Sequence, residues 1–185
     1  YDIELGNYNI VSVVEDITMS VLEYIKNKGI ELIFDTDTEE EIIACDPDKI
    51  ERIILNLLSN AIKYTRPDGK IIVNINSDKE NVYISVKDTG IGMPKQKLNK
   101  IFNRYEQIDN KLTKSFNGSG IGLSLVKSLV EMHKGKITVE SKENEGSKFT
   151  ITLPKKRINN EHIKNTNLTK SRVEKCNIEF SDIYN

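Results

Sequence analysis

The sequence predicts an α+β fold, a two-layer α/β sandwich in which helices cover one face of a mixed, mostly antiparallel sheet. Two observations support this prediction. Apolar residues alternate in two hairpin patterns, at 70–88 and 137–153, and hairpins are antiparallel. Four other segments have apolar residues at helical spacing, so each has one face to bury against a sheet. A doubly wound fold would instead alternate single strands with helices.

Before residue 46, the chain is expected to contain one helix and three short strands. Asn9 can cap a helix that runs to about Lys28, and Gly29 suits the position that ends it. The acidic run 35–41 is expected to be a solvated turn. Short apolar stretches predict the strands, at residues 2–5, 30–34 and 42–45.

The central helix is predicted over residues 46–65. Asp46 can cap its N-terminus, and Pro47 suits its first position. One border of its apolar face carries four residues within a sector of roughly 100°: Asn56, Asn60, Lys63 and Tyr64. Neutral oxygens, a cation and a ring could together bind a metal, phosphates and a base. Taken alone, the pattern fits a solvated helix edge equally well.

The remaining elements follow from the same two periodicities. The turn residues at 66–69 end the central helix. The polar stretch 106–117 lacks a core pattern and is expected to be a mobile loop, and Gly135 is expected to end the last helix. The predicted elements are a hairpin at 70–88, a short helix at 94–105, a helix at 121–133 and a hairpin at 137–153 that turns at 143–146.

The 185 residues are expected to form one domain, 1–154, followed by a tail, 155–185. The tail loses the apolar pattern, so we expect it to be flexible or to dock as a strand at a sheet edge. The formal net charge of -1 gives no indication of nucleic-acid or membrane binding. Cys45 and Cys176 are isolated, which fits a reducing compartment and a cytoplasmic location.

The first of two glycine-rich loops, 88–93, follows a predicted strand directly, so Asp88 is expected at the strand end. A carboxylate only accepts hydrogen bonds, which suits an exocyclic amine such as that of adenine. Gly90 and Gly92 permit a close approach that a Cβ atom would forbid. The alternative interpretation is an Asx turn that leads into the next helix.

The second loop, 118–123, opens the helix at 121–133. Unpaired N–H groups and the helix dipole favour an anion there, so phosphate is the expected ligand. The loop is neither a Walker A sequence nor a convincing Rossmann fingerprint. Its glycines could also form a simple hinge. The presence of both loops and the Asn-bearing helix in one chain favours a nucleotide site.

Four motifs resemble, in order and spacing, those of the catalytic ATP-binding domain of bacterial two-component sensor histidine kinases. The resemblance covers residues 2–154. Residues 56–64 resemble an N box, 88–92 a G1 box, 102–105 an F box and 118–123 a G2 box. It implies the Bergerat (GHKL ATPase) fold, with ATP between the helical layer and a lid formed by 106–117.

The resemblance also implies which residues bind ATP and Mg²⁺. Asp88 would bind the adenine amino group, and Tyr64 would pack on the base. Asn60 would bind Mg²⁺ through its amide oxygen, with Asn56 nearby or acting through water, and Lys63 would be a point charge on the phosphates. Asn56, Asn60 and Lys63 are the expected catalytic residues. The other implied nucleotide contacts are Gly90, Ile91, Gly92, Met93, Ile101, Phe102, Gly118, Ser119, Gly120, Ile121, Gly122 and Leu123.

Asn56 distinguishes two kinds of relative with this fold. Gyrase-type and chaperone-type ATPases are similar but place a Glu at the position of Asn56, where it activates water. An amide cannot act as a general base, so ATP is expected to wait for another nucleophile. In the resembled family, that nucleophile is a histidine on a separate dimerisation domain of the same kinase, and a response regulator is an indirect partner.

His133 and His162 are the only histidines, and neither lies in a phosphoacceptor context. His133 is expected to be structural. We therefore expect a catalytic domain without its phosphoacceptor, monomeric in isolation and without direct membrane contact. Two alternatives stay open: a serine kinase of the anti-sigma type, and a degenerate ATP-sensing module that transfers nothing.

The sequence departs from the family pattern after the F box. Many members carry an Arg there, whereas this chain has Gln107, so a phosphate-directed cation from that position is in doubt. Lys111 and Lys114 in the lid are either transient phosphate contacts or ordinary solvated lysines. Arg104 is nearby but could equally serve a structural or docking role.

Overall fold

The computed structural model describes residues 2–103 and 122–159. Several predictions concern residues outside these ranges and stay predictions. They are those for the lid 106–117 with Gln107, Lys111 and Lys114, for Arg104, for Gly118, Ser119, Gly120 and Ile121, and for the tail from residue 160 with His162 and Cys176.

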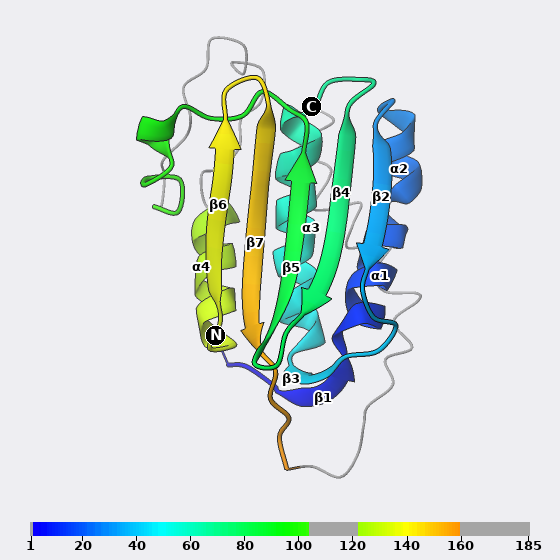
Figure 1. Ribbon diagram of the computed structural model, residues 1–185, viewed down its shortest axis with the longest axis vertical. Coiled ribbons are helices and arrows are strands. Elements are labelled where there is room, and N and C mark those ends of the chain that lie inside the picture. The colour runs from blue at the N-terminus through cyan, green and yellow to red at the C-terminus, as the bar shows by residue number, and fades with distance from the viewer. Residues whose placement is uncertain (1, 104–121, 160–185) are drawn as a thin grey trace.

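One five-stranded sheet forms the first layer, with the strand order β2-β4-β5-β7-β6 (Figure 1). Strand β2 (Glu31–Thr36) pairs in parallel with β4 (Lys70–Ser77). All other pairs are antiparallel, and they join β4 to β5 (Asn81–Asp88), β5 to β7 (Gly146–Pro154) and β7 to β6 (Lys136–Lys142). The predicted mixed, mostly antiparallel sheet is therefore confirmed, and so are both hairpins.

The helices form the second layer on one face of this sheet (Figure 1). They are α1 (Ile10–Ser20), α2 (Leu22–Asn27), α3 (Pro47–Tyr64) and α4 (Gly122–Met132). A separate two-stranded sheet, β1 (Gly6–Asn9) with β3 (Ile42–Cys45), closes one end of the domain. The two-layer α/β sandwich is thus the observed fold.

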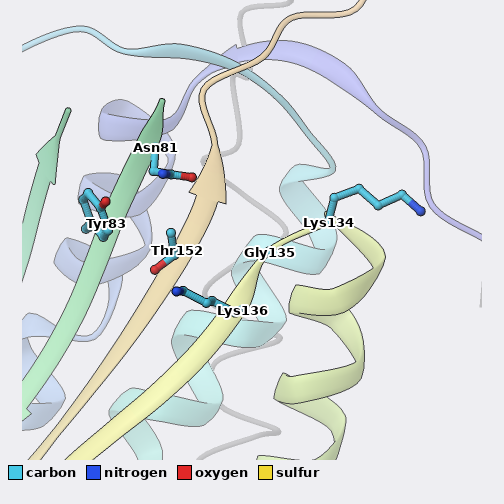
Figure 2. Close-up of a pocket in the computed structure, with 6 residues that line it drawn as sticks. All are labelled: Asn81, Tyr83, Lys134, Gly135, Lys136 and Thr152. Atoms are coloured by element: carbon cyan, nitrogen blue, oxygen red, sulfur yellow. The ribbon is translucent and has the colours of Figure 1, made fainter. Parts of the chain in front are cut away.

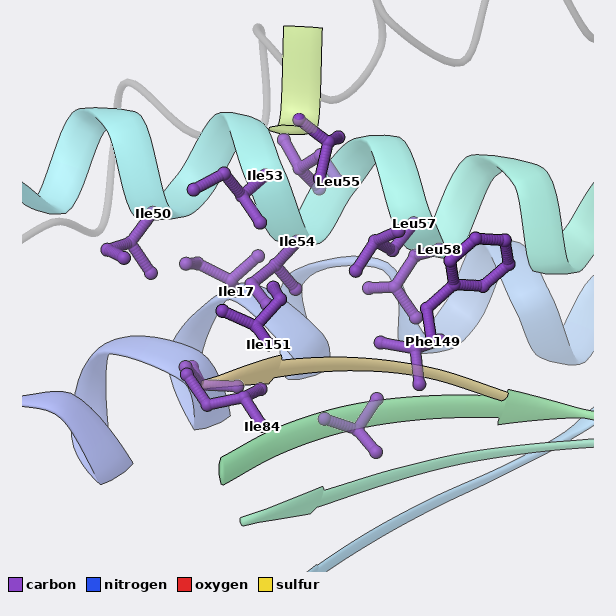
Figure 3. Close-up of a cluster of buried hydrophobic side chains, with 14 of the residues drawn as sticks. Ile17, Ile50, Ile53, Ile54, Leu55, Leu57, Leu58, Ile84, Phe149 and Ile151 are labelled. Atoms are coloured by element: carbon purple, nitrogen blue, oxygen red, sulfur yellow. The ribbon is translucent and has the colours of Figure 1, made fainter. Parts of the chain in front are cut away.

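Helix α3 is the centre of the hydrophobic core (Figure 3). Ile54 faces the sheet above Ile151 and Ile84, and Leu58 lies beside Phe149. Leu55 points away from the sheet toward α4 and is 2% exposed. Because α3 is covered on both sides, only a narrow strip of its surface remains accessible, and the predicted site residues lie along that strip.

Both helix caps predicted from the sequence are present. Asn9 Oδ1 accepts a hydrogen bond from Val11 N, and Asp46 Oδ1 accepts from Asp48 N at 3.1 Å. His133, just past α4, supports the second cap, because its Nε2 accepts from Asp46 N at 3.1 Å. His133 Nδ1 lies 2.8 Å from Leu129 O and must donate, so the ring is neutral with its proton on Nδ1. Burial lowers the pKa of His133, which favours this neutral form.

Two predictions for the N-terminal segment were wrong. The strand expected at 2–5 lies instead at Gly6–Asn9, where pairing with β3 and burial of Asn7 define it. The helix expected to run unbroken from Asn9 is interrupted at Val21. Thr18 Oγ1 and Ser20 Oγ donate to backbone carbonyls of the preceding turn, which weakens the helix just before this break.

Two further predictions need correction. The short helix expected at 94–105 is only a 3₁₀ turn at Lys95–Lys97, followed by irregular turns to residue 103. Its apolar residues anchor the segment on the core without repeating through a helix. The left-handed residue that ends α4 is Lys134, with φ of 59°, and not Gly135.

Residues 155–158 continue from β7 and lie against the small sheet. Ala44 N donates to Lys156 O at 2.7 Å, and the Asn7 side chain both donates to Ile158 O and accepts from Ile158 N, each at 2.9 Å. Lys155 also forms an ion pair with the buried Glu41 at 2.8 Å. We call this segment the C-terminal strap. The proposed domain boundary at 154 stays a prediction.

No helix within residues 2–103 and 122–159 has both the length and the apolar character needed to cross a bilayer. Cys45 on β3 is a free thiol that is 0% exposed. Burial raises its pKa to about 12, so the thiol stays protonated at neutral pH.

Candidate functional site

The polar edge of α3 carries the predicted residues Asn56, Asn60, Lys63 and Tyr64, and each is half-buried. Asn56 has a fixed orientation, because its Nδ2 donates to Arg52 O at 2.7 Å. The Asn56 Oδ1 atom faces Gly122 at the start of α4, where a Cβ atom would lie 2.9 Å from it. The amide therefore presents its oxygen at the junction of α3 and α4.

Lys63 and Tyr64 form a pair at the C-terminal end of α3. Lys63 Nζ lies 5.5 Å from the centre of the Tyr64 ring, within cation–π range. Burial lowers the pKa of Lys63 and raises the pKa of Tyr64. The Tyr64 ring compensates the positive charge of Lys63 only in part. A phosphate oxygen close to Lys63 would compensate that charge more fully.

Asp88 ends β5 as predicted and is 5% exposed. Its Oδ1 accepts a hydrogen bond from Gly90 N at 2.8 Å. Burial raises the pKa of Asp88 to about 6, while backbone hydrogen bonds from Gly90 and Ser147 act in the opposite direction. The bond to Gly90 is the Asx-type bond of the alternative interpretation, while the role of Asp88 as an acceptor for adenine stays a prediction.

The end of α3 and the loop after β5, residues 88–93, are joined directly. Ile91 N donates to Tyr64 O at 3.2 Å. Gly90 makes this approach possible, because a Cβ atom there would overlap the Tyr64 carbonyl oxygen. The structure thus brings together the two stretches that the sequence singled out separately. We call residues 88–93 the base loop.

The β6–β7 turn supports the base loop from the other side, which the sequence did not indicate. Asn144 N donates to Ile91 O at 2.7 Å, and Met93 N donates to Ser141 Oγ at 2.9 Å. Gly92 has φ of 63°, and a Cβ atom there would overlap Lys142 O. The small residues around this turn are visible in the sequence. The residues that they contact lie about 50 positions away along the chain, so the sequence does not show the pairing.

The remaining predicted contacts divide into three groups. Met93 and Ile101 are buried at the edge of the core, and Leu123 packs on the same core from α4. Phe102 stacks edge-on against Phe149, with ring centres 6.3 Å apart. Its part in nucleotide binding stays a prediction.

A hollow of about 210 Å³ lies at the start of β5, at the opposite end of that strand from Asp88. It contains none of the predicted site residues; its lining is Asn81, Tyr83, Lys134, Gly135, Lys136 and Thr152. Figure 2 shows that Lys134 points away from the other side chains, so the polar groups do not converge on one ligand. This hollow is therefore separate from the predicted site, whose residues lie along the α3 edge and in the base loop.

Known proteins resemble this chain in sequence and in fold. The family model described as histidine kinase-, DNA gyrase B-, and HSP90-like ATPase matches residues 45–157. Histidine kinase P4 of Formosa agariphila is 37% identical over 157 residues, which cover 83% of this chain and 12% of that protein. Sensor histidine kinase WalK of Bacillus subtilis is 37% identical over 136 residues, covering 72% of this chain and 22% of WalK. The chain thus spans less than a quarter of the length of either relative.

Solved structures match over a larger share of their length. The catalytic domain of histidine kinase ThkA superposes with a TM-score of 0.73 at 28% identity, covering 83% of this chain and 99% of that domain. ThkA in complex with response regulator protein TrrA gives a TM-score of 0.69 at 27% identity and covers 83% of this chain and 42% of that one. The chain belongs to the family of histidine kinase-, DNA gyrase B- and HSP90-like ATPases, and its matched region is a catalytic domain of the sensor histidine kinase type.

Proposed function

We propose that this chain binds ATP with Mg²⁺ and donates the γ-phosphoryl group to a histidine on a separate dimerisation domain of the same kinase. The orientation of Asn56 carries this proposal. Its amide nitrogen is bound to Arg52 O, and its oxygen is directed toward the start of α4. A carboxamide cannot take a proton from water near neutral pH, so this position holds ATP without activating a hydrolytic water.

The base would bind at the junction of α3 and the base loop. The Asp88 carboxylate is the acceptor for the exocyclic amine of adenine, and the Tyr64 ring packs on the base. The hydrogen bond between Ile91 N and Tyr64 O supports this assignment, because it keeps the two groups on adjacent backbone segments. Groups that are held in place before the ligand arrives reduce the entropy cost of binding.

The phosphates would extend from the base toward Lys63 and the start of α4. Lys63 supplies a cation, and Gly122 lies at the helix N-terminus, where backbone N–H groups favour anions. Asn60 would hold Mg²⁺ through Oδ1, with Asn56 Oδ1 one turn away on the same edge. Within the part of the chain that the structure describes, the Asn60 side-chain amide makes no hydrogen bond. Mg²⁺ accepts such neutral oxygens together with phosphate oxygens and water, and when bound it neutralises phosphate charge.

The phosphoryl acceptor would be supplied by another domain. His133 is 5% exposed, and both of its ring nitrogens are hydrogen-bonded, so it is not available as a nucleophile. A histidine presented by a dimerisation domain fills this role, and a response regulator then acts as the indirect partner. The complex of ThkA with TrrA supports the same kind of assembly here. We place this reaction in the cytoplasm, where ATP is the available phosphoryl donor.

Transfer to a supplied domain tests the proposal. The chain is mixed with Mg²⁺, ATP labelled on its γ-phosphate, and the dimerisation domain of the same kinase. We expect an acid-labile, base-stable label on that domain, as phosphohistidine gives. A matched domain in which the acceptor histidine is replaced by Gln should take up no label.

Other outcomes of this experiment decide between the alternatives. Acid-stable phosphoserine would indicate a serine kinase of the anti-sigma type. ATP binding without transfer to any supplied histidine domain would indicate a nucleotide sensor. Rapid release of free phosphate without a partner would contradict the role given to Asn56.

A further inference from the structure

Ser141, on β6, forms a three-way hydrogen-bond junction beneath the base loop. Its Oγ accepts from Met93 N at 2.9 Å, donates to Gly146 O at 2.9 Å and lies 2.8 Å from Ser147 Oγ. A hydroxyl has one donor and two acceptor lone pairs. All three contacts are satisfied together if Ser147 Oγ donates to Ser141, so this hydroxyl uses its full capacity.

The same residues reach Asp88 through the sheet. Ser147 pairs with Asp88 across β5 and β7 and with Ser141 across β6 and β7, so the three residues form one row over three strands. Gly90 N donates a hydrogen bond to the Asp88 carboxylate, and the nearby Ser147 backbone N–H also favours its ionised form. Ser141 therefore contacts the base loop after Asp88, through Met93 N, and the strand beside Asp88, through Gly146 and Ser147.

We propose that Ser141 is a positioning residue for nucleotide binding, which holds the Asp88 carboxylate and the base loop in the geometry that receives the base. Ser141 acts through Met93, Gly146 and Ser147, and it does not itself touch the ligand. The inference rests on the proposed function, because the ligand whose affinity Ser141 sets is ATP.

Two effects should follow from removing the hydroxyl. The half-buried Met93 N–H and Gly146 carbonyl would lose their partner, and the base loop would be held on one side only. Two neutral hydrogen bonds of ordinary strength correspond to about a tenfold change in a dissociation constant. In addition, a loosened Ser147 would stabilise the ionised form of Asp88 less, so a higher pH would be needed to keep the acceptor charged.

The experiment uses three variants of the full chain, titrated calorimetrically with Mg²⁺–ATP between pH 5 and 8. Ser141→Ala should weaken ATP binding about tenfold and move the acid limb of the pH profile upward relative to the parent. Ser141→Thr keeps the hydroxyl and should restore both values. Ser128→Ala is the matched control, because the Ser128 hydroxyl donates to Ser124 O within α4.

The outcomes separate this inference from the function on which it rests. Parent protein that bound no ATP would overturn the proposed function. Normal binding by the parent and equal binding by Ser141→Ala would overturn only the role of Ser141. Weaker binding with an unshifted pH profile would also overturn it, because that result would indicate general destabilisation and not a loss of support for Asp88.

Discussion

The carbonyl oxygen of Tyr64, at the end of α3, accepts a hydrogen bond of 3.2 Å from the backbone N–H of Ile91. This single bond joins the helix that carries the predicted metal and phosphate ligands to the loop that carries the predicted base acceptor. It can form because the residue before Ile91 is a glycine. A Cβ atom at that position would overlap the same carbonyl oxygen.

Replacing Gly90 with Ala should therefore separate the two halves of the site. The added methyl group would push the base loop away from α3, and we expect a stability loss of roughly 1–3 kcal/mol, typical of overpacking. ATP affinity should fall at least about tenfold. Gly6→Ala is a suitable control, since a Cβ there meets the movable ring of Tyr8 far from the site. Thermal unfolding and calorimetry of both variants measure the effect, and equal behaviour would contradict it.

Asp88→Asn should weaken ATP binding strongly. The amide would present donors toward the exocyclic amine of adenine and toward backbone N–H groups, where only an acceptor fits. A buried polar group left unsatisfied costs about 1–3 kcal/mol, so we expect a loss of roughly five- to 150-fold in affinity. Calorimetric titration with ATP measures it, and an unchanged affinity would refute the assignment of Asp88 to the base.

ATP binding should also weaken in mild acid. Because the pKa of Asp88 is raised from 3.8 to about 6, its contribution to folding stability is full below 3.8 and is lost as the pH rises through about 6. In the free protein, burial thus makes the ionised Asp88 carboxylate less favourable than the protonated one. ATP binding requires the ionised carboxylate, and this form is lost below pH 6. Affinity measured from pH 5 to 8 should show this limb. Adenosine, which carries the base without titrating phosphates, should show the same limb.

Asn60→Ala should reduce the dependence of ATP binding on Mg²⁺. The variant removes a neutral oxygen ligand and leaves the base contacts in place. Affinity without Mg²⁺ should stay close to the parent value, while the gain on adding Mg²⁺ should shrink. Asn74→Ala, a half-buried residue on β4, controls for loss of an amide elsewhere. Identical metal titrations of Asn60→Ala and the parent would exclude the proposed metal ligand.

The C-terminal strap should contribute to stability but not directly to the site. Ending the chain after residue 159 should leave thermal unfolding unchanged. Ending it after 154 removes the bonds to Ala44 and Asn7 and the ion pair with the buried Glu41, at a cost of roughly 2–4 kcal/mol. Both truncations should still bind ATP at low temperature. If the two melted together, the strap would have no such role.

The parts of the fold that follow from local signals were predictable. Asp46 and Pro47 defined the start of α3, and the alternation of Ile71, Val73 and Ile75 defined β4, because caps and periodicity act within a few residues. The helix predicted from Pro94 was wrong because that prediction relied on the same kind of local signal. Leu98 and Ile101 are spaced as on a helix, yet each packs on the core from an irregular turn.

The support of the site could not be predicted in this way. Ser141 and Met93 are 48 residues apart, and the bond between them exists only because β7 brings the β6–β7 turn beside the end of β5. The alternation of Ile137 and Val139 places Ser141 on the inward face of β6, but that local pattern does not indicate which residues Ser141 contacts. Tertiary pairing of this kind depends on which strands become neighbours in the sheet, and local periodicity does not reveal that order.

Because Cys45 is buried, the reactivity of its thiol reports when β3 separates from the strand with which it pairs. A thiol with a pKa near 12 and no exposed surface cannot react with an alkylating reagent while β3 stays paired. The rate at which Cys45 is alkylated therefore measures how often the small sheet separates from the rest of the domain. ATP bound at the far end of α3 would slow that rate only to the extent that the whole domain opens as one cooperative unit.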